Sequence, residues 1–323
     1  MNSIDPIALV AEAALAPSVH NVQPARWRFG GSTVDLWEDL ARRLPAGDPE
    51  RRDAELSLGA AVEGMALALS ARDLALEETG EVLAERMGDL IARRRFRIVP
   101  GARDPLQPHV RARQSHRGGF EPVTGRDREA ALTLAGEDCT VVVDPQRIGS
   151  IAQQVDRSGH RFFRDPAFRA ELRSWMRLRR DDPRWSRDGL NAEAMAMTRV
   201  EALGAGLVLG PLFRPLDAVG LAAPLTAEAA VIRGSAGILL FHRAADEPRF
   251  DSGRAFYRAW LRLEAAGLRG AVMAALADDR EGAARVAELV PAGRTLVSAL
   301  RIGRAPAGSG YRRARIKPRE LLV

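Results

Sequence analysis

Apolar residues along this chain gather in separate runs, and the longest of these runs have the length of helices. Residues 53–74 are apolar nearly all the way round a helix, which is typical of a buried helix, and residues 253–268 form a second strong helical stretch. Residues 236–242 and 295–302 are mostly apolar runs of strand length, typical of buried strands. The mixture predicts a protein of both helices and strands.

The first forty residues predict a helix, a polar loop and a hairpin. Asp5 and Pro6 form a helix start, with aspartate as N-cap and proline at the first helical position. Residues 17–24 have a proline at each end, and both prolines disfavour helix, so this segment is predicted to be a loop. Residues 26–29 and 33–37 have the composition of two short strands, and the Gly-Gly-Ser between them predicts a hairpin.

The middle of the chain is less regular. Residues 101–122 are rich in proline, glycine and arginine, which indicates a connection between two units. A strand is predicted at 140–143 and a long helical stretch at 145–180. Residues 181–191 break this pattern and are predicted to form a loop or a mobile cover. Residues 204–224 are apolar with glycine and proline interruptions, so either helix or lid fits them.

A weak internal repeat links the two buried helices. A shift of 194 aligns residues 59–74 with residues 253–268. The shift matches Gly59 with Gly253, Ala61 with Ala255, Leu67 with Leu261, Leu69 with Leu263, Ala71 with Ala265 and Leu74 with Leu268. Two explanations stay open: chance convergence of two helices rich in alanine and leucine, or an old duplication in which one chain imitates a two-fold dimer.

Length and composition exclude several classes of protein. With 323 residues and 46% apolar residues, the chain is long enough for a sizeable core and about two folding units, so dominant disorder is excluded. Cys139 is the only cysteine, which excludes an internal disulfide and favours a reducing compartment. The terminus Met1–Pro6 has no basic leader region, and no apolar run is long enough to span a bilayer. We therefore expect a cytoplasmic protein.

The net charge of +6 is carried almost wholly by arginine, because Lys317 is the only lysine. Such a charge fits either a compositional bias or a basic face for nucleic acid or another anion. The arginines lack interleaved aromatic residues, which disfavours nucleic acid. They cluster at 93–97, 111–117 and 312–319.

Residues 113–117, Arg-Gln-Ser-His-Arg, form the strongest candidate site. In an extended segment, residues two apart share a face, so Arg113, Ser115 and Arg117 would converge on one point. Guanidinium groups bind phosphate through bidentate, charge-assisted hydrogen bonds, and a hydroxyl adds a neutral donor. The alternative is a solvated basic linker that pairs with acidic neighbours such as Glu121.

Residues 16–24, Ala-Pro-Ser-Val-His-Asn-Val-Gln-Pro, form the second candidate. Their donors and acceptors lie on a stiff backbone, which suits recognition of a flat polar heterocycle. The alternative is a loop whose side chains only cap the preceding helix. His109, His116, His160 and His242 have no ligand partners at metal-site spacing, so no metal is predicted.

Together, the two candidates resemble the nitroreductase family. Residues 16–24 are similar to the family's flavin-contacting loop, and residues 113–117 are similar to the segment that holds the FMN phosphate and pyrimidine edge. In ordinary members the arginine segment comes first, whereas here the loop does. This order resembles the Acg-type FMN-binding branch, in which one chain holds two degenerate units arranged like the family's homodimer. Residues 42–49 and 301–315 resemble further parts of that branch.

The resemblance implies an α+β fold in which two degenerate nitroreductase-like units are fused as a pseudo-dimer. The halves would be residues 1–107 and 108–323, with a lid over 181–224. One FMN between them would accept hydride from NAD(P)H and pass it to an electron-poor small molecule of nitroaromatic, quinone or enone type. The alternative is a protein that binds and sequesters FMN under the lid. No nucleic acid or membrane partner is expected, and the chain would be a monomer or a homodimer.

The resemblance also implies the site residues. The cofactor would contact Pro17, Ser18, Asn21, Gln23, Arg113, Ser115, Arg117, Arg313 and Arg315. His20 would line the substrate face. No residue is expected to act as a catalytic acid or base, because the flavin carries the redox chemistry.

Overall fold

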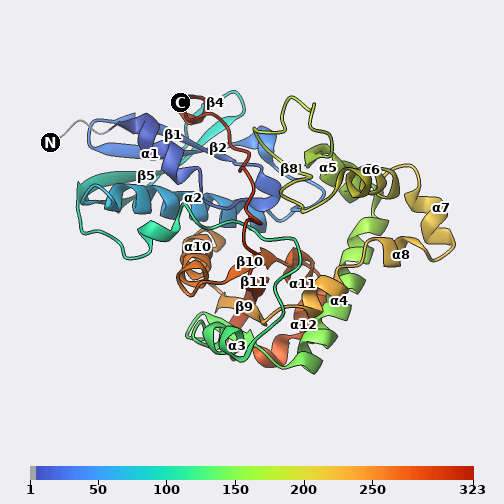
Figure 1. Cartoon of the computed structure of the whole chain (residues 1–323). Coiled ribbons are helices and arrows are strands. Elements are labelled where there is room, and N and C mark those ends of the chain that lie inside the picture. The colour runs from blue at the N-terminus through green and yellow to red at the C-terminus, as the bar shows by residue number, and fades with distance from the viewer. Residues whose placement is uncertain (1–4) are drawn as a thin grey trace.

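Two antiparallel sheets enclose a pair of central helices in the computed structural model, which describes residues 5–323 (Figure 1). Met1–Ile4, part of the terminus predicted to lack a leader, lie outside the described residues. The helices are α2 (Arg52–Ser70) and α10 (Arg249–Ala265), and they pack against each other. The layers therefore run sheet, helix, helix, sheet, which makes the fold α+β.

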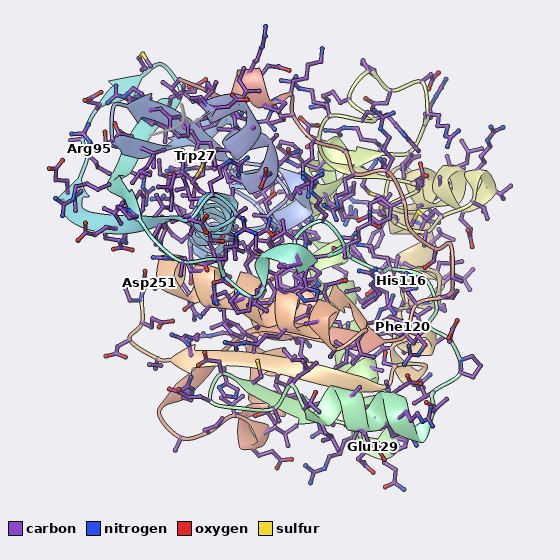
Figure 2. All side chains as sticks on the ribbon, turned by 60° about the vertical axis from the view of Figure 1, so that its left-hand side comes forward. Trp27, Arg95, His116, Phe120, Glu129 and Asp251 are labelled. Carbon is purple, nitrogen blue, oxygen red and sulfur yellow. The ribbon has the colours of Figure 1, made fainter. Side chains whose placement is uncertain are left out.

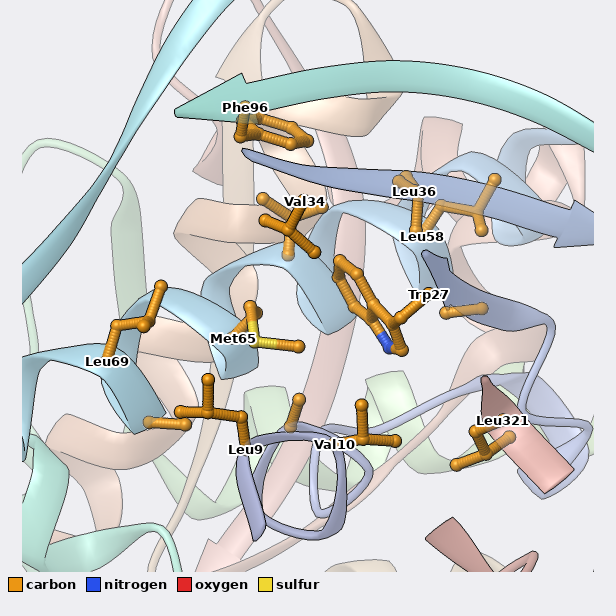
Figure 3. Packing of buried hydrophobic residues seen from close by; sticks show 14 of the residues in the cluster. Leu9, Val10, Trp27, Val34, Leu36, Leu58, Met65, Leu69, Phe96 and Leu321 are labelled. Atoms are coloured by element: carbon orange, nitrogen blue, oxygen red, sulfur yellow. The ribbon is translucent and has the colours of Figure 1, made fainter. Parts of the chain in front are cut away.

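The first sheet has the strand order β1-β2-β5-β3. Its strands are β1 (Ala25–Gly30), β2 (Thr33–Asp39), β3 (Leu74–Val82) and β5 (Leu90–Pro100), with the short β4 (Arg86–Met87) on β5. One face packs on α1 (Pro6–Ala13) and α2. Figure 3 shows this core, in which Leu9, Val10, Trp27, Val34, Met65 and Phe96 meet. The hairpin and the capped first helix predicted from the sequence are confirmed, with Asp5 accepting a hydrogen bond from the Ile7 amide at 2.9 Å.

The second sheet repeats the topology of the first. Its order is β6-β9-β11-β10, from β6 (Cys139–Val142), β9 (Gly237–Ala244), β10 (Arg269–Val272) and β11 (Arg294–Gly303). Along the chain, β1, β2, α2, β3 and β5 correspond in order and neighbours to β6, β9, α10, β10 and β11, and all the pairings are antiparallel. Residues 145–233 are an insertion between β6 and β9.

The two central helices cross at the glycines matched by the shift of 194. A Cβ at Gly59 would lie 1.8 Å from the carbonyl oxygen of Phe250, and a Cβ at Gly253 would lie 2.3 Å from that of Leu56. Leu56 and Phe250 are themselves 194 residues apart. The contact is therefore reciprocal, as it is across a two-fold axis.

Each sheet is followed by an extended segment that crosses to the other half. After β5, the chain runs along the second sheet, where the His116 amide donates to the Gly270 carbonyl at 2.9 Å. Figure 2 shows His116 and Phe120 beside this sheet. After β11, the carboxyl-terminal tail returns to the first sheet, where the Val323 amide donates to the Trp27 carbonyl at 2.9 Å. The connection predicted at 101–122 is confirmed as an irregular segment.

Two of the predicted helices need correction. The stretch 145–180 is not one helix but α4 (Pro145–Arg164) and α5 (Pro166–Trp175), because Pro166 interrupts the helical bonding and the Asp165 carboxylate caps α5. The helix predicted over 53–74 ends at Ser70, and Leu74 begins β3.

The insertion is mainly helical and projects from the body (Figure 1). Its shorter elements are β7 (Met176–Arg177), β8 (Leu190–Asn191), α6 (Arg199–Val208), α7 (Phe213–Ala218), α8 (Ala222–Leu225) and α9 (Ala229–Arg233). The remaining helices are α3 (Gly125–Leu132), α11 (Ala274–Asp278) and α12 (Arg280–Arg285). No helix among residues 5–323 is long and apolar enough to cross a membrane.

Candidate functional site: a cavity between the two halves

A cavity of about 290 Å³ lies between the part of the chain built on the first sheet and the part built on the second. Its walls come from the loop after α1, the first turns of α2, the connecting segment, the tail, and parts of α10, α11 and the insertion. The lining residues that the sequence had singled out are Pro17, Ser18, His20, Asn21, Arg113, Ser115, Arg117, Arg313 and Arg315. The fold thus brings together residues almost 300 positions apart in the chain.

The loop after α1 has a strained backbone. His20, Asn21 and Gln23 have φ of 44°, 56° and 54°, a region that residues other than glycine seldom occupy. Two hydroxyls hold this shape: Ser57 Oγ accepts from the Val19 amide at 3.1 Å, and Ser18 Oγ accepts from the Gln23 amide at 3.0 Å. The loop is therefore shaped by its own contacts and by α2.

Arginines, rather than the loop's side chains, cap the end of α1. The Leu15 carbonyl accepts from Arg113 Nη2 at 2.5 Å, and the Ala14 carbonyl accepts from Arg315 Nε. Cations suit a helix carboxyl terminus because the last carbonyls carry partial negative charge. These carbonyls therefore bond to distant arginines and not to side chains of the loop, so the alternative in which the loop only caps its own helix does not explain the contacts.

Arg113, Arg313 and Arg315 form one cluster. Arg113 is 3% exposed and lies over the ring of Trp260 at 4.8 Å, and its carbonyl accepts from Arg313 Nη2 at 2.6 Å. Burial, followed by repulsion from Arg113, lowers the pKa of Arg313 to about 10 and that of Arg315 to about 9. Both Arg313 and Arg315 therefore remain cationic at neutral pH.

No carboxylate within the described part of the chain pairs with this cluster or with Arg117. The hydrogen bonds of these arginines go to carbonyl oxygens and to the Asn21 amide oxygen. Among residues 5–323, buried donors around the cluster also lack a protein partner: Arg113 Nε, Arg313 Nε, Tyr257 Oη and Trp260 Nε1. Buried polar groups are normally satisfied, so a cluster of this kind fits an anionic ligand with several acceptor oxygens.

Arg117 does not share an anchor with Arg113, although the sequence predicts that the two guanidiniums converge. Arg117 Nη1 donates to the Ala194 carbonyl at 3.2 Å, whereas Arg113 reaches Leu15. The chain enters this segment through a turn, in which the Arg113 amide bonds to the His109 carbonyl, so the extended alternation does not include Arg113. Burial first and then Arg117 lower the pKa of His20 to about 4, so His20 is neutral at pH 7.

The Arg117→Ala variant should raise the pKa of His20. Removing the nearby cation favours the imidazolium, but burial is the larger cause, so the pKa should stay below its ordinary 6.5. NMR titration of the histidine ring protons measures this change, and the exposed Arg111→Ala provides a control. An unchanged His20 titration in Arg117→Ala would show that the guanidinium and the imidazole do not interact.

Two polar side chains of the loop serve as ties. Asn21 Nδ2 donates to the carbonyls of Gly189 at 3.1 Å and Ala314 at 3.2 Å. Gln23 lies outside the cavity lining; its Nε2 donates to the Arg187 carbonyl at 3.0 Å and its Oε1 accepts from the Ile316 amide at 3.0 Å. The loop thereby fixes the tail and the insertion against the first half.

A buried carboxylate that the sequence did not single out anchors the predicted lid. Asp188 accepts from Arg177 at 2.7 Å and from Arg42 at 3.2 Å, and its side chain is 3% exposed. Of the predicted lid at 181–224, Gly189, Leu190 and Ala194 line the cavity, whereas no residue of α6, α7 or α8 does. In Figure 1, α7 and α8 lie at the outer end of the insertion. Only the first part of that segment therefore covers the cavity.

Two carboxyl groups of the lining were also missed. Asp53 on α2 and Asp278 on α11 both face the cavity, and burial is the first cause that raises the pKa of each. No group of three or more histidine, cysteine or acidic residues within 5–323 is arranged to hold a metal ion.

Comparison with known proteins gives short or distant matches, and no family model matches this chain. A stretch of 58 residues is 38% identical to a protein of Mycobacterium tuberculosis, which is found in two strains. That protein bears the name "Putative NAD(P)H nitroreductase". The match covers 18% of this chain and 17% of the relative, so the chain spans about a sixth of the length of the curated relatives that it matches.

Two solved structures show a distant likeness. A nitroreductase of Bacteroides fragilis with bound FMN has 12% identity and a TM-score of 0.35, over 64% of this chain and 92% of the other. An FMN-dependent nitroreductase of Mycobacterium smegmatis in complex with NADPH has 17% identity and a TM-score of 0.35, over 63% and 88%. At TM-scores below 0.5, neither likeness bears on the function of this chain.

Proposed function

We propose that the cavity binds one FMN between two fused nitroreductase-like halves, and that the protein passes hydride from NAD(P)H to an electron-poor small molecule. The observation that carries this proposal is the arginine cluster. It lines a cavity and, within the part of the chain that the structure describes, has no carboxylate partner and lies beside buried donors without acceptors. A phosphate group would satisfy the charge of Arg113, Arg313 and Arg315 and the free donors together.

The residues divide into two groups in this proposal. The three clustered arginines and the Ser115 hydroxyl would hold the phosphate. Pro17, Ser18 and Asn21 would address the ring system, Arg117 would place charge beside it, and neutral His20 would line the substrate face. Gln23 would act indirectly by holding the tail that carries Arg313 and Arg315. Bound there, FMN would supply the hydride chemistry, and the protein would supply position, charge and access.

The pseudo-dimer is supported by the repeated topology and by the reciprocal crossing at Gly59 and Gly253. The shift of 194 carries the cavity residues Leu56 and Ala60 onto Phe250 and Arg254. At that second position the space is taken by protein: the Arg94 guanidinium lies over the Phe250 ring at 4.1 Å, and Arg254 pairs with Glu63 at 3.1 Å. We therefore expect one FMN per chain.

The alternative is a protein that sequesters FMN. It is favoured by the lid anchored at Asp188 and by the tie between Asn21 and Gly189, because both hold the cover against the cavity wall. A cytoplasmic location, the absence of nucleic acid and membrane partners, and a monomeric or homodimeric state stay predictions.

Anaerobic mixing with NADPH or NADH separates the two functions. A reductase should lose the visible flavin absorbance within seconds of mixing with at least one donor, because chemistry in enzymes commonly runs at about 1–1000 per second. Stopped-flow absorbance measures this rate. Bleaching that takes hours with both donors would exclude the reductase and leave the sequestering protein.

A further inference from the structure

Exposed apolar side chains gather on α6, α7, α8 and the turns between them. Eleven large apolar side chains are exposed among residues 5–323, and seven of these lie between Val200 and Leu225. Val200, Leu203 and Leu207 belong to α6, and the other four follow from Leu212 onward. These seven side chains form the outer patch. In Figure 1, α7 and α8 lie at the outer end of the insertion, so the patch is on the part of the molecule that projects from the body.

Helix α6 is apolar on both of its faces. Val200, Leu203 and Leu207 follow one another at intervals of three and four residues, so they share one face of the helix. That face is open, because the exposed fraction of Val200 is 79% and that of Leu203 is 63%. Ala202, on the same helix, is buried and packs inward. A helix that is apolar all round is normally covered all round, and nothing among residues 5–323 covers this outer face.

The outer patch offers few groups that could form hydrogen bonds to another protein. Residues 202–227 contain three polar side chains, Arg214, Asp217 and Thr226. Asp217 pairs with Arg164 at 3.0 Å, and Thr226 Oγ1 donates to the Ala222 carbonyl at 3.0 Å. Protein–protein interfaces depend on direct hydrogen bonds and on aromatic anchors, and leucine and valine seldom act as such anchors. A surface of leucine and valine instead fits hydrocarbon, which needs no hydrogen bonds.

Cations border the outer patch. Arg199 precedes Val200 at the start of α6, and Arg214 lies in α7. Arg173 lies beside the patch as well, because a Cβ at Gly210 would be 2.9 Å from its Cζ. Within residues 5–323, none of these three arginines has a carboxylate within ion-pair distance. The carboxylate of Glu201, the acidic residue in the first turn of α6, accepts from the amide of the helix's own N-cap at 2.7 Å.

We propose that the outer patch is a peripheral membrane-binding surface that selects anionic lipid. Its leucine and valine side chains enter the boundary between headgroups and acyl chains, and Arg173, Arg199 and Arg214 contact the lipid phosphates. An apolar face bordered by cations binds in this way, because burial of apolar area and attraction to anionic headgroups add together. The surface goes beyond the proposed function and revises the expectation that the protein has no membrane partner.

The charges favour lipid over a second copy of the chain. A two-fold contact through the outer patch would place the same patch on both sides of the interface. The unpaired arginines of one copy would then approach those of the other, and the patch has no unengaged carboxylate to balance them. Like charges brought together in this way oppose association, whereas an anionic headgroup layer supplies the opposite charge.

Cosedimentation of the full chain with vesicles measures the binding. One set of vesicles contains equal parts of phosphatidylcholine and phosphatidylglycerol, and the other contains phosphatidylcholine alone. We expect the protein to bind the mixed vesicles at least about tenfold more tightly than the neutral ones, because each arginine near an anionic surface adds to the attraction. Added salt should reduce this difference by screening the charges.

The apolar part of the patch is tested with Leu203→Asp/Leu207→Asp. Two leucines that enter the bilayer are lost, so binding to the mixed vesicles should weaken at least about tenfold. Met87→Asp/Leu132→Asp is the matched control, because it makes the same kind of change at two exposed apolar residues outside the patch. This control should bind like the wild type. Both double variants are surface changes, and an unchanged denaturant midpoint shows that they fold.

The cationic border is tested with Arg199→Gln/Arg214→Gln. Binding to the mixed vesicles should weaken at least about tenfold, while the weak binding to neutral vesicles should stay the same. The control Arg126→Gln/Arg312→Gln removes two exposed charges outside the patch and should bind like the wild type.

Two results would overturn the proposal. The first is a wild type that stays in the supernatant with both kinds of vesicle. The second is equal vesicle binding by Leu203→Asp/Leu207→Asp and its control. If sedimentation velocity also shows a wild-type dimer that this leucine variant dissociates, the patch belongs to a second copy of the chain. None of these measurements depends on flavin, so their failure leaves the proposed function standing.

Discussion

Replacing Arg313 by alanine should weaken FMN binding roughly 10- to 100-fold, because a hydrogen bond to a charged group contributes about 1.5–3 kcal/mol. Arg313 lies in the cavity wall, and its Nη2 donates to the carbonyls of Arg111 and Arg113. Its buried Nε has no partner among the described residues 5–323. The side chain is therefore positioned by the protein and has a donor free for a ligand. Fluorescence titration of FMN into flavin-free protein measures the dissociation constant.

The neighbouring Arg312 provides the matched control. Arg312 is exposed. Its replacement by alanine removes one positive charge from the tail, as the replacement of Arg313 does. Arg312→Ala should bind FMN like the wild type. Equal dissociation constants for Arg313→Ala and the wild type would place the phosphate elsewhere.

Substituting Gly59 by alanine should destabilise the protein by roughly 2–4 kcal/mol, at or above the usual cost of overpacking. The new methyl group would lie 1.8 Å from the Phe250 carbonyl oxygen, and backbone rather than a flexible side chain would have to move. Because the crossing of α2 and α10 joins the two halves, the loss should appear in the denaturant midpoint of the whole chain.

Gly149→Ala on α4 tests whether the effect belongs to the crossing. A Cβ at Gly149 meets no atom within 4 Å, so alanine should stabilise this helix by about 0.5–1 kcal/mol. A Gly59→Ala variant as stable as the wild type would contradict the close approach of the two helices.

The sequence predicted the elements whose apolar pattern is simple and missed those whose pattern is charged. The buried strands β9 and β11 and the central helices follow runs that are mostly apolar. Strand β5 contains Arg93–Arg97 and was not predicted, because one face of the first sheet carries ion pairs instead of apolar contacts. There Arg95 pairs with Asp35 at 2.7 Å and Arg97 with Glu77 at 2.8 Å. The reason that arginine fits this strand is visible only when β5 is paired with the neighbouring strands that carry the acidic partners.

The repeated topology was only partly visible in the sequence for a related reason. The shift of 194 detects the helix crossing, where glycine is required on both helices. Elsewhere the insertion at 145–233 separates β6 from β9, so the shift that aligns the two helices cannot also bring β1 onto β6. An insertion does not change the order of the strands in a sheet, so the rest of the repeat is visible only in the strand order of the two sheets.

The residues of the candidate site also divide into those that the sequence predicted and those that it missed. Local motifs identified the loop after α1, the segment 113–117 and the arginines of the tail. Asp53, Asp278 and Asp188 stand alone in the sequence, and only folding brings them to the cavity or its cover. The separate anchors of Arg113 and Arg117 likewise depend on a turn that the extended reading of this segment does not contain.

The visible absorption spectrum of the freshly purified protein, read with the amount of FMN per chain, tests the central claim most directly. We expect a yellow protein with one FMN per chain, released on denaturation because no covalent link is proposed. A colourless protein that takes up no FMN when the cofactor is added in excess would contradict the account.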